Sequence, residues 1–367
     1  MRKIKVLIIH RTLSMLLGGG ELFFVRLIRS LTKSNVDIDF ITAKPFFRKI
    51  NCVYKDLNVK YVKSPYLWSL AQIHLSRYID PLDEYCFKFQ LFRFLRKNIK
   101  KYDIILVYHY TRIAKDIKIT FNKPVIYVSF GYAPCENNIR FLDKVLTNGA
   151  GLDIFKKFGN VVNIPIGIDN NLKKISSNIR EEYQIKNDDF VILFVGRITY
   201  IKNLPFLIQG FNEFNKIINN SRLIIVGSGE LLNKYNHQDN RNIIFTGSVS
   251  QEVLNKFYST ADVFTLCSFH ECLPLTIDEA KAYSLPIVAT RVGGMIKQVK
   301  HGKGGFLIDH NVNEFVDSML KLYKNNNLRK NMGDYNKKSI KSQSWNKSAN
   351  IFANLCESLI NQENKIN

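Results

Sequence analysis

Several features that would assign the chain to a familiar class are missing from its sequence. No stretch reaches the roughly 18 to 20 uninterrupted apolar residues that a membrane-spanning helix needs. The opening MRKIKVLIIHRTL lacks the longer apolar run and the cleavage site of a secretory signal, so we expect it to form the first strand. The six cysteines form no C-x-x-C pair, which argues against a zinc knuckle and against a disulfide framework. We therefore expect a cytoplasmic protein.

Nucleotide and metal fingerprints are missing as well. The sequence contains neither G-x-x-x-x-G-K-[ST] nor G-x-G-x-x-G, so it indicates neither a nucleoside triphosphatase nor a dinucleotide enzyme. The seven histidines form no cluster with ligand spacing, and we expect no metal site. Asp37 and Asp39 spell D-x-D, a metal motif in other proteins. Here both lie on one face of an expected strand, and we interpret them as structural.

The size and charge of the chain indicate two domains and an acidic partner. Its 367 residues suit two domains of roughly 150 to 200 residues each. The net charge is +22, and residues 1–165 hold 28 Lys and Arg against 12 Asp and Glu. Residues 166–367 hold 25 Lys and Arg against 19 Asp and Glu, so most of the excess positive charge lies in the first half. An anionic membrane, a polyanionic lipid-linked acceptor or nucleic acid would each explain it, and so would a solvated surface without a partner.

Apolar runs alternate with helical patterns along the whole chain, which is typical of parallel βαβ units. We expect strands at KIKVLIIH, VDIDFITA, YDIILVYH and PVIYVSF in the first half. VVNIPIGIDNN has the composition of a hinge.

A second series of expected strands follows: FVILFVGRI, SRLIIVGSG, NIIFTGSV, ADVFTLCS and PIVATRVGG. We expect helices in this half around 204–217, 230–235, 251–259, 275–283 and 312–323, and a final one from Trp345 to Ile360. The predicted fold class is therefore α/β with two Rossmann-like parallel sheets.

Residues just after the strands of such sheets bind ligands. Arg197 follows one strand, and Lys202 stands five residues later, just before a helix. Two cations beside a helix N-terminus can neutralise a diphosphate without a metal. The same two residues taken alone would be ordinary surface charges; their position between a glycine-ended strand and a helix favours the site.

Two carboxylates flank the start of another helix. Glu271 lies on the expected loop and Glu279 about one turn inside the helix that Pro274 and Leu275 begin. Such carboxylates could accept hydrogen bonds from sugar and ribose hydroxyls. They could equally be solvent-facing acids that the helix dipole stabilises.

Residues 185–310 together resemble the donor domain of glycosyltransferase family 4, whose members are retaining enzymes of the GT-B fold. The resemblance is carried by FVILFVGRITYIKNLPFLIQGF, LIIVGSGE, HECLPLTIDEA and GKGGFLID, in unbroken order and with the family's spacing. Residues 1–165 resemble the family more weakly, through the Gly18, Gly19 and Glu21 loop.

The resemblance implies a division of the chain and a role for each matching residue. Residues 1–165 would bind the acceptor, and 166–340, facing them across a cleft, would bind a nucleotide-diphosphate sugar. Helix 341–367 would pack back on the first domain. No metal or other cofactor would be needed, because Arg197 and Lys202 would stabilise the charge of the departing diphosphate, which itself could take the acceptor proton. Arg197, Lys202 and Glu271 would be catalytic; the donor-binding residues would be Gly18, Gly19, Gly227, Gly229, Leu275, Thr276 and Glu279.

Four positions depart from the family's pattern. Cys272 and Ser284 stand where the family usually has glycine, and Lys297 replaces an acid. Phe130 stands where many members carry a histidine close to the reacting sugar, and His109 could compensate by its position on the acceptor side. A histidine at a strand end is also commonly structural.

The segment CFKFQLFRFLRKNIKKY interleaves aromatic and basic residues, as a helix on the inner face of an anionic membrane would. Phe87, Leu91, Phe94 and Leu95 would equally form an ordinary core-facing stripe. The function indicated first is sugar transfer to a glycan or lipid-linked acceptor in cell-surface polysaccharide biosynthesis. The alternatives are an epimerase of the same fold and a basic nucleic-acid-binding protein; the motifs above give no reason to expect nucleic acid.

Overall fold

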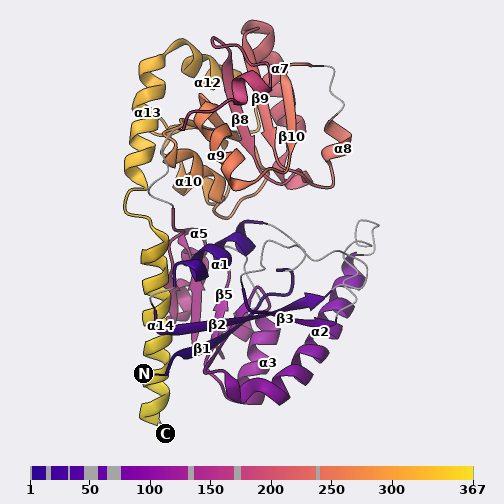
Figure 1. Ribbon diagram of the computed structural model, residues 1–367, viewed down its shortest axis with the longest axis vertical. Coiled ribbons are helices and arrows are strands. Elements are labelled where there is room, and N and C mark those ends of the chain that lie inside the picture. The colour runs from indigo at the N-terminus through magenta and orange to yellow at the C-terminus, as the bar shows by residue number, and fades with distance from the viewer. Residues whose placement is uncertain are drawn as a thin grey trace. The chain divides into compact units, whose positions relative to one another are not determined.

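The strands of the chain collect into two separate sheets, and every strand pair in both is parallel. The computed structural model describes residues 2–13, 18–31, 34–44, 57–63, 76–130, 136–168, 175–236 and 240–366. Unit 1 comprises Met1–Gly167 and Trp345–Asn367, and unit 2 comprises Ile168–Ser344 (Figure 1). The predicted fold class is confirmed.

The sheet of unit 1 has seven strands in the order β3-β2-β1-β4-β5-β6-β7. Its central strands are continuous apolar runs, because helices cover both faces of a parallel sheet. The strands are β1 (Ile4–Ile9), β2 (Val36–Lys44), β3 (Val59–Lys63), β4 (Ile104–Tyr108), β5 (Val125–Val128), β6 (Lys144–Thr147) and β7 (Val161–Asn163).

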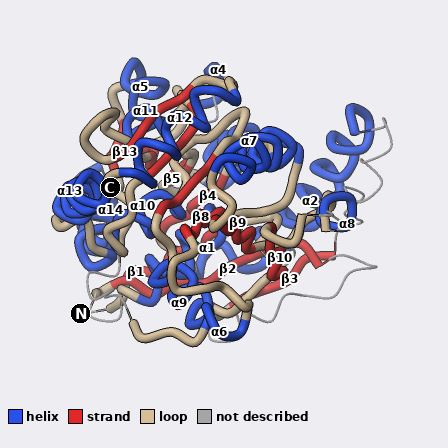
Figure 2. The backbone as a smooth tube through the Cα atoms, turned by 90° about the horizontal axis from the view of Figure 1, so that it is seen from above, coloured by secondary structure: helices blue, strands red, loops and turns tan. Residues whose placement is uncertain are grey.

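All helices of unit 1 except α14 lie between these strands in sequence. The tube view distinguishes the helices, in blue, from the strands, in red (Figure 2). The helices are α1 (Gly19–Arg29), α2 (Ser76–Asn98), η3 (Ile99–Lys101), α3 (Thr111–Phe121), α4 (Glu136–Ile139), α5 (Gly149–Phe155), η4 (Lys156–Phe158) and α14 (Trp345–Ile366).

One face of the unit 1 sheet packs against α2 and α3. Phe87, Leu91 and Leu95 of α2 are fully buried in the same cluster as Leu7 and Ile9 of β1. The aromatic and aliphatic stripe of α2 is therefore a core-facing stripe. Whether α2 also contacts a membrane depends on its other face.

Helix α14 belongs to unit 1 although it follows unit 2 in sequence. Its first residue, Trp345, packs edge-on against Phe23 of α1 with ring centroids 5.6 Å apart. A Cβ on Gly167 would lie 2.5 Å from the backbone of Trp345, so only glycine permits this approach. The Ser348 hydroxyl donates to the Pro165 carbonyl at 2.7 Å. These contacts hold the start of α14 against the end of the first chain segment.

The sheet of unit 2 has six strands in the order β10-β9-β8-β11-β12-β13. All six residues of β8 and all four of β11 and of β12 are buried. The strands are β8 (Phe190–Val195), β9 (Ser221–Val226), β10 (Ile243–Gly247), β11 (Val263–Leu266), β12 (Ile287–Thr290) and β13 (Gly305–Ile308).

The five helices predicted in unit 2 start at or close to their predicted first residues, whereas α6, α11 and α13 were not predicted. Helix α10, for example, begins at Leu275 directly after Pro274. The helices are α6 (Ile179–Glu182), η5 (Tyr200–Lys202), α7 (Leu204–Ile217), α8 (Leu232–Tyr235), α9 (Gln251–Thr260), α10 (Leu275–Ala282), α11 (Met295–Gln298), α12 (Val312–Lys324) and α13 (Asn326–Ser339).

The D-x-D pair is structural, as interpreted. Asp39 is 2% exposed, pairs with Lys60 and accepts a hydrogen bond from the Tyr102 hydroxyl at 2.8 Å. Burial raises the pKa of Asp39, but hydrogen bonds from Lys60 and Tyr102 lower it more, and the net pKa lies below its usual value. Asp37 is exposed and lies 3.6 Å from Lys5.

Candidate functional site

The strand order of unit 2 reverses between β8 and β11, which are neighbours in the sheet although two strands separate them in sequence. Loops that leave the carboxyl ends of two such strands diverge and leave room for a ligand. Arg197 and Lys202 follow β8, and Glu271 follows β11. The topology therefore brings the predicted catalytic residues to one edge of one sheet.

Lys202 and Glu271 form an ion pair at this edge. The Lys202 ammonium contacts Glu271 Oε1, and the two side chains are only 19% and 11% exposed. The Ser268 hydroxyl donates to the same Oε1 at 2.7 Å. Lys202 is placed by the short helix η5, which ends at that residue because Asn203 adopts a left-handed conformation.

Arg197 follows β8 by two residues and is half-buried. Among the described residues, nothing forms a hydrogen bond or ion pair with its guanidinium group. A partly buried cation without a carboxylate partner favours an anionic ligand, because a charge removed from water needs compensation. The Lys202 Cε lies 3.6 Å from where a Cβ on Gly196 would stand, so the Lys202 side chain passes close to the residue that precedes Arg197.

The structure gives Gly227 and Gly229 a packing role. A Cβ on Gly227 would lie 1.9 Å from the carbonyl oxygen of Gly196, and its φ of 139° is reserved for glycine. A Cβ on Gly229 would lie 2.3 Å from the Ile198 carbonyl. These glycines hold the loop after β9 against the loop that carries Arg197. Their predicted contact with the donor stays a prediction.

Helix α10 presents its first amides at the same edge. Leu275 and Thr276 are its first two residues, whose N–H groups have no partner within a helix. Glu279 is 6% exposed and accepts a hydrogen bond from the Tyr258 hydroxyl at 3.0 Å. The two carboxylates near the start of α10 therefore have different partners. Glu271 forms an ion pair with Lys202, and Glu279 accepts a hydrogen bond from Tyr258.

Two of the departures from the family's pattern have structural consequences. Ser284 has φ of +59° just after α10, which explains why glycine is usual at this position. Cys272 is part-buried, and burial raises the pKa of its thiol, with the neighbouring Glu271 charge acting in the same direction. Lys297 lies in α11, and nothing in the structure explains its replacement of an acid.

In unit 1, the predicted glycine loop is the start of α1. Gly18 is the N-cap and Gly19 the first helical residue, and the Gly18 N–H donates to Glu21 Oε2 at 3.0 Å. The other oxygen of Glu21 accepts from the Thr12 hydroxyl at 3.1 Å. Glu21 therefore fixes the conformation of this loop as a capping residue.

The two predicted acceptor-side residues both border Tyr108, at the end of β4. The rings of His109 and Tyr108 lie 3.9 Å apart, and Phe130 lies 6.1 Å from Tyr108 and 4.6 Å from Phe23. His109 has φ of +67°, a strained conformation for a side chain with a Cβ. Phe130 thus fills an aromatic cluster, and His109 remains the candidate for a polar role.

Sequence reasoning missed His10, which follows β1. Its ring is fully buried, stacks on Tyr108 at 4.4 Å, and lies with Nε2 3.9 Å from Glu21 Oε1. Neither ring nitrogen has a hydrogen-bond partner among the described residues. Burial lowers the pKa of His10 to about 3. Burial, with a smaller contribution from His10, lowers the pKa of His109 to about 4.

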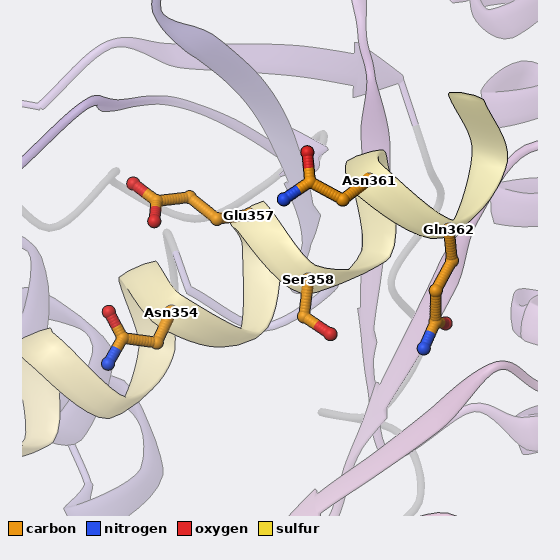
Figure 3. A pocket seen from close by; sticks show the side chains of 5 residues that line it. All are labelled: Asn354, Glu357, Ser358, Asn361 and Gln362. Atoms are coloured by element: carbon orange, nitrogen blue, oxygen red, sulfur yellow. The ribbon is translucent and has the colours of Figure 1, made fainter. Parts of the chain in front are cut away.

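A hollow on unit 1 lies away from these residues. It is lined by five polar side chains that all come from α14 and recur at the spacing of one helix face (Figure 3). No three His, Cys, Asp or Glu side chains gather as metal ligands in the described ranges. Within the same ranges, no helix is long and apolar enough to cross a membrane.

Comparison with known proteins identifies unit 2. Residues 176–339 match the family model of the glycosyl transferases group 1. This segment belongs to that family. The solved structure of Anabaena HepE in complex with UDP-glucose superposes with a TM-score of 0.75 and 17% identity, covering 97% of this chain and 100% of that one. A likeness at this identity shows the fold, which is GT-B.

Curated glycosyltransferases are similar over part of their length. The capsular polysaccharide biosynthesis glycosyltransferase CapM of Staphylococcus aureus is 28% identical over 216 residues, 57% of this chain. The alpha-monoglucosyldiacylglycerol synthase of Acholeplasma laidlawii is 32% identical over 219 residues, 56% of this chain. The chain spans about half the length of these relatives, 52% and 53%. They give no support to the epimerase alternative.

Three residues that touch the predicted site could not be found from the family-like motifs. Ser268 lies three residues before Glu271, and Tyr258 lies in α9, so neither stands at a position that the motifs mark. His10 could have been noticed as a polar residue that directly follows an apolar strand. Its burial depends on α1 and β4, which no local pattern shows.

The two buried histidines predict an acid-sensitive unit 1. Their folded-state pKa values of about 3 and 4 lie below the ordinary 6.5, so the stability they contribute is present above pH 6.5 and is lost as the pH falls towards 4. As the pH falls from 7.5 to 5, each histidine should lower the free energy of unfolding by about 2 kcal/mol. Chemical denaturation of His10→Phe should show a flatter pH dependence, and the exposed-loop variant His270→Gln should keep the wild-type one. If the unfolding free energy of His10→Phe depended on pH as steeply as that of the wild type, the lowered pKa assigned to His10 would be wrong.

Proposed function

We propose that the protein transfers a sugar from a nucleotide-diphosphate sugar to a glycan or lipid-linked acceptor. The observation that carries the proposal is the cluster of Arg197, Lys202 and Glu271 at the reversal of strand order in unit 2. The family match of residues 176–339 and the UDP-glucose named for HepE support a nucleotide sugar as the donor.

The ion pair gives the cluster a mechanism for binding. In the ligand-free protein Glu271 neutralises Lys202, so the ammonium group is held in place at little electrostatic cost. A diphosphate that arrives beside Arg197 competes for the ammonium. Glu271 then keeps its hydrogen bond from Ser268 and has lone pairs free for the hydroxyls of the donor sugar. The two charges would thus bind opposite ends of the same donor.

We further propose that transfer is retaining and independent of metal ions. The bond between the anomeric carbon and the diphosphate oxygen breaks while the acceptor oxygen bonds to the same face of the sugar. The acceptor proton passes to the departing diphosphate, whose charge Arg197, Lys202 and the first amides of α10 stabilise. No protein nucleophile is needed. Gly227 and Gly229 keep the backbone close enough to border the diphosphate.

Substitution of the paired residues tests the site. Lys202→Ala and Glu271→Ala should each lower turnover by about 100-fold or more, because a preorganised charge is lost where charge develops. Lys216→Ala removes a lysine that is paired with Glu213 on the exposed surface of α7, and it should keep wild-type turnover. Sugar release from a panel of nucleotide sugars measures the effect, with thermal unfolding to establish that the variants are folded. Transfer that survives both site substitutions would refute the assignment.

We also propose that α2 contacts an anionic membrane through its exposed face. Tyr85 and Phe89 are 67% and 60% exposed, and they share a helical stripe with the exposed Arg93, Arg96 and Lys97. Exposed aromatics followed by cations match the interface of an anionic lipid surface. The relatives named for capsule and glycolipid synthesis support acceptors at such a surface.

Vesicle sedimentation tests the membrane proposal. Replacing both Arg96 and Lys97 by Gln should weaken binding to phosphatidylglycerol vesicles at low salt by about tenfold or more. The double substitution of Lys337 and Lys338 by Gln removes the same charge from the exposed surface of α13 and should have little effect. The proposed membrane contact of α2 would be refuted if the two double variants lost vesicle binding equally. It would also be refuted if the wild type bound no vesicles.

A further inference from the structure

Unit 2 carries an exposed row of aromatic rings, formed by Tyr200, Phe269 and His310. The Tyr200 and Phe269 centroids lie 5.2 Å apart with ring planes at 31°, and Phe269 and His310 lie 5.1 Å apart at 35°. Tyr200 is 74% exposed and Phe269 42%. Large aromatic side chains left in water next to one another mark an interaction surface, because their burial in the core would have been favourable.

The rings are held in place without being covered. The Phe269 N–H donates to the Ile201 carbonyl at 2.8 Å, which ties the loop after β11 to the loop after β8. His310 packs edge-on against the buried Phe206 of α7, with centroids 5.6 Å apart. Tyr200 therefore stands on a fixed support, and a ligand that stacks on it need not order a mobile side chain.

The row borders the pair proposed to handle the donor sugar. Tyr200 precedes Lys202 by two residues in η5, and Phe269 precedes Glu271 by two residues. The two loops follow the strands at which the order of the sheet reverses. Whatever receives the sugar must lie next to it, so a surface beside Lys202 and Glu271 is suited to the receiving molecule.

We propose that the Tyr200, Phe269 and His310 row is a subsite for a pyranose ring of the acceptor. This inference rests on the proposed function. It specifies the acceptor as a molecule that carries a saccharide next to the hydroxyl that receives the transferred sugar. A pyranose has an apolar face of C–H groups, which aromatic ring faces attract through their negative quadrupole. Its hydroxyls can reach the rim of the row, where Arg291 and Asp309 form an exposed pair at 3.5 Å next to His310.

Saccharide binding by the full chain tests the subsite, with maltotriose and chitotriose as uncharged probes in saturation-transfer NMR. The wild type should bind at least one probe, and Tyr200→Ala should weaken that binding about five- to tenfold. Tyr200→Trp keeps an aromatic face and should restore it. Ile201→Ala removes a 50% exposed apolar side chain from the same loop without removing a ring, and it should bind as the wild type does.

Titration of UDP on the same variants separates this inference from the proposed function. UDP affinity should be unchanged in Tyr200→Ala; a protein that binds no nucleotide at all refutes the proposed function instead. The subsite is refuted if neither saccharide probe binds, or if Tyr200→Ala and Ile201→Ala lose saccharide affinity equally. It is also refuted if Tyr200→Ala loses UDP affinity, because the aromatic row would then contact the nucleobase. Loss of vesicle binding without loss of saccharide binding would make it a membrane contact and would also refute the subsite.

Discussion

The ion pair between Lys202 and Glu271 is the interaction on which the rest of the candidate site depends. Two charges that are mostly removed from water are stable only when each compensates the other and the remaining lone pairs are satisfied. Here the Ser268 hydroxyl supplies the additional hydrogen bond. The pair also connects the loops that leave β8 and β11, because one partner follows each strand. A ligand that binds here must offer charge of its own in exchange.

Close backbone packing between neighbouring loops fixes the position of the Lys202–Glu271 pair. The loop after β9 can lie against the loop that carries Arg197 only because Gly227 and Gly229 lack a Cβ. Likewise, the Gly294 N–H donates to the Glu271 carbonyl at 3.0 Å, which connects the loop after β12 to the paired carboxylate. Four strand ends thus form one rigid edge. Such rigidity is what electrostatic stabilisation of a developing charge requires.

The parallel sheets and the longer helices could be predicted from sequence because their apolar patterns are continuous. Strands β3, β6, β7 and β13 escaped prediction; β3 and β7 lie at sheet edges and bury few of their residues, so they show no continuous apolar run. Helix α13 was missed for a different reason: it is rich in Asn and Lys and buries only Met332, Gly333 and Asn336. A helix with so narrow a buried face gives no clear hydrophobic period.

The candidate site was predictable only in part, for reasons that lie in its contacts. Arg197, Lys202 and Glu271 stand directly after strands, where the topology gives them a common location. That Lys202 would pair with Glu271, and that Tyr258 would hold Glu279, depends on tertiary distances between elements far apart in sequence. The aromatic row shows the same limit, because Tyr200, Phe269 and His310 come from three separate loops.

We propose that fixed cations of the protein, without a divalent ion, neutralise the diphosphate of the donor. Calorimetric titration of UDP-glucose into the protein with excess EDTA, at low and at high salt, tests it most directly. The account predicts an affinity that EDTA leaves unchanged and that salt weakens only modestly, since the cations are partly buried and salt screens buried charges less than exposed ones. Binding that appears only after Mg²⁺ or Mn²⁺ is added would contradict it.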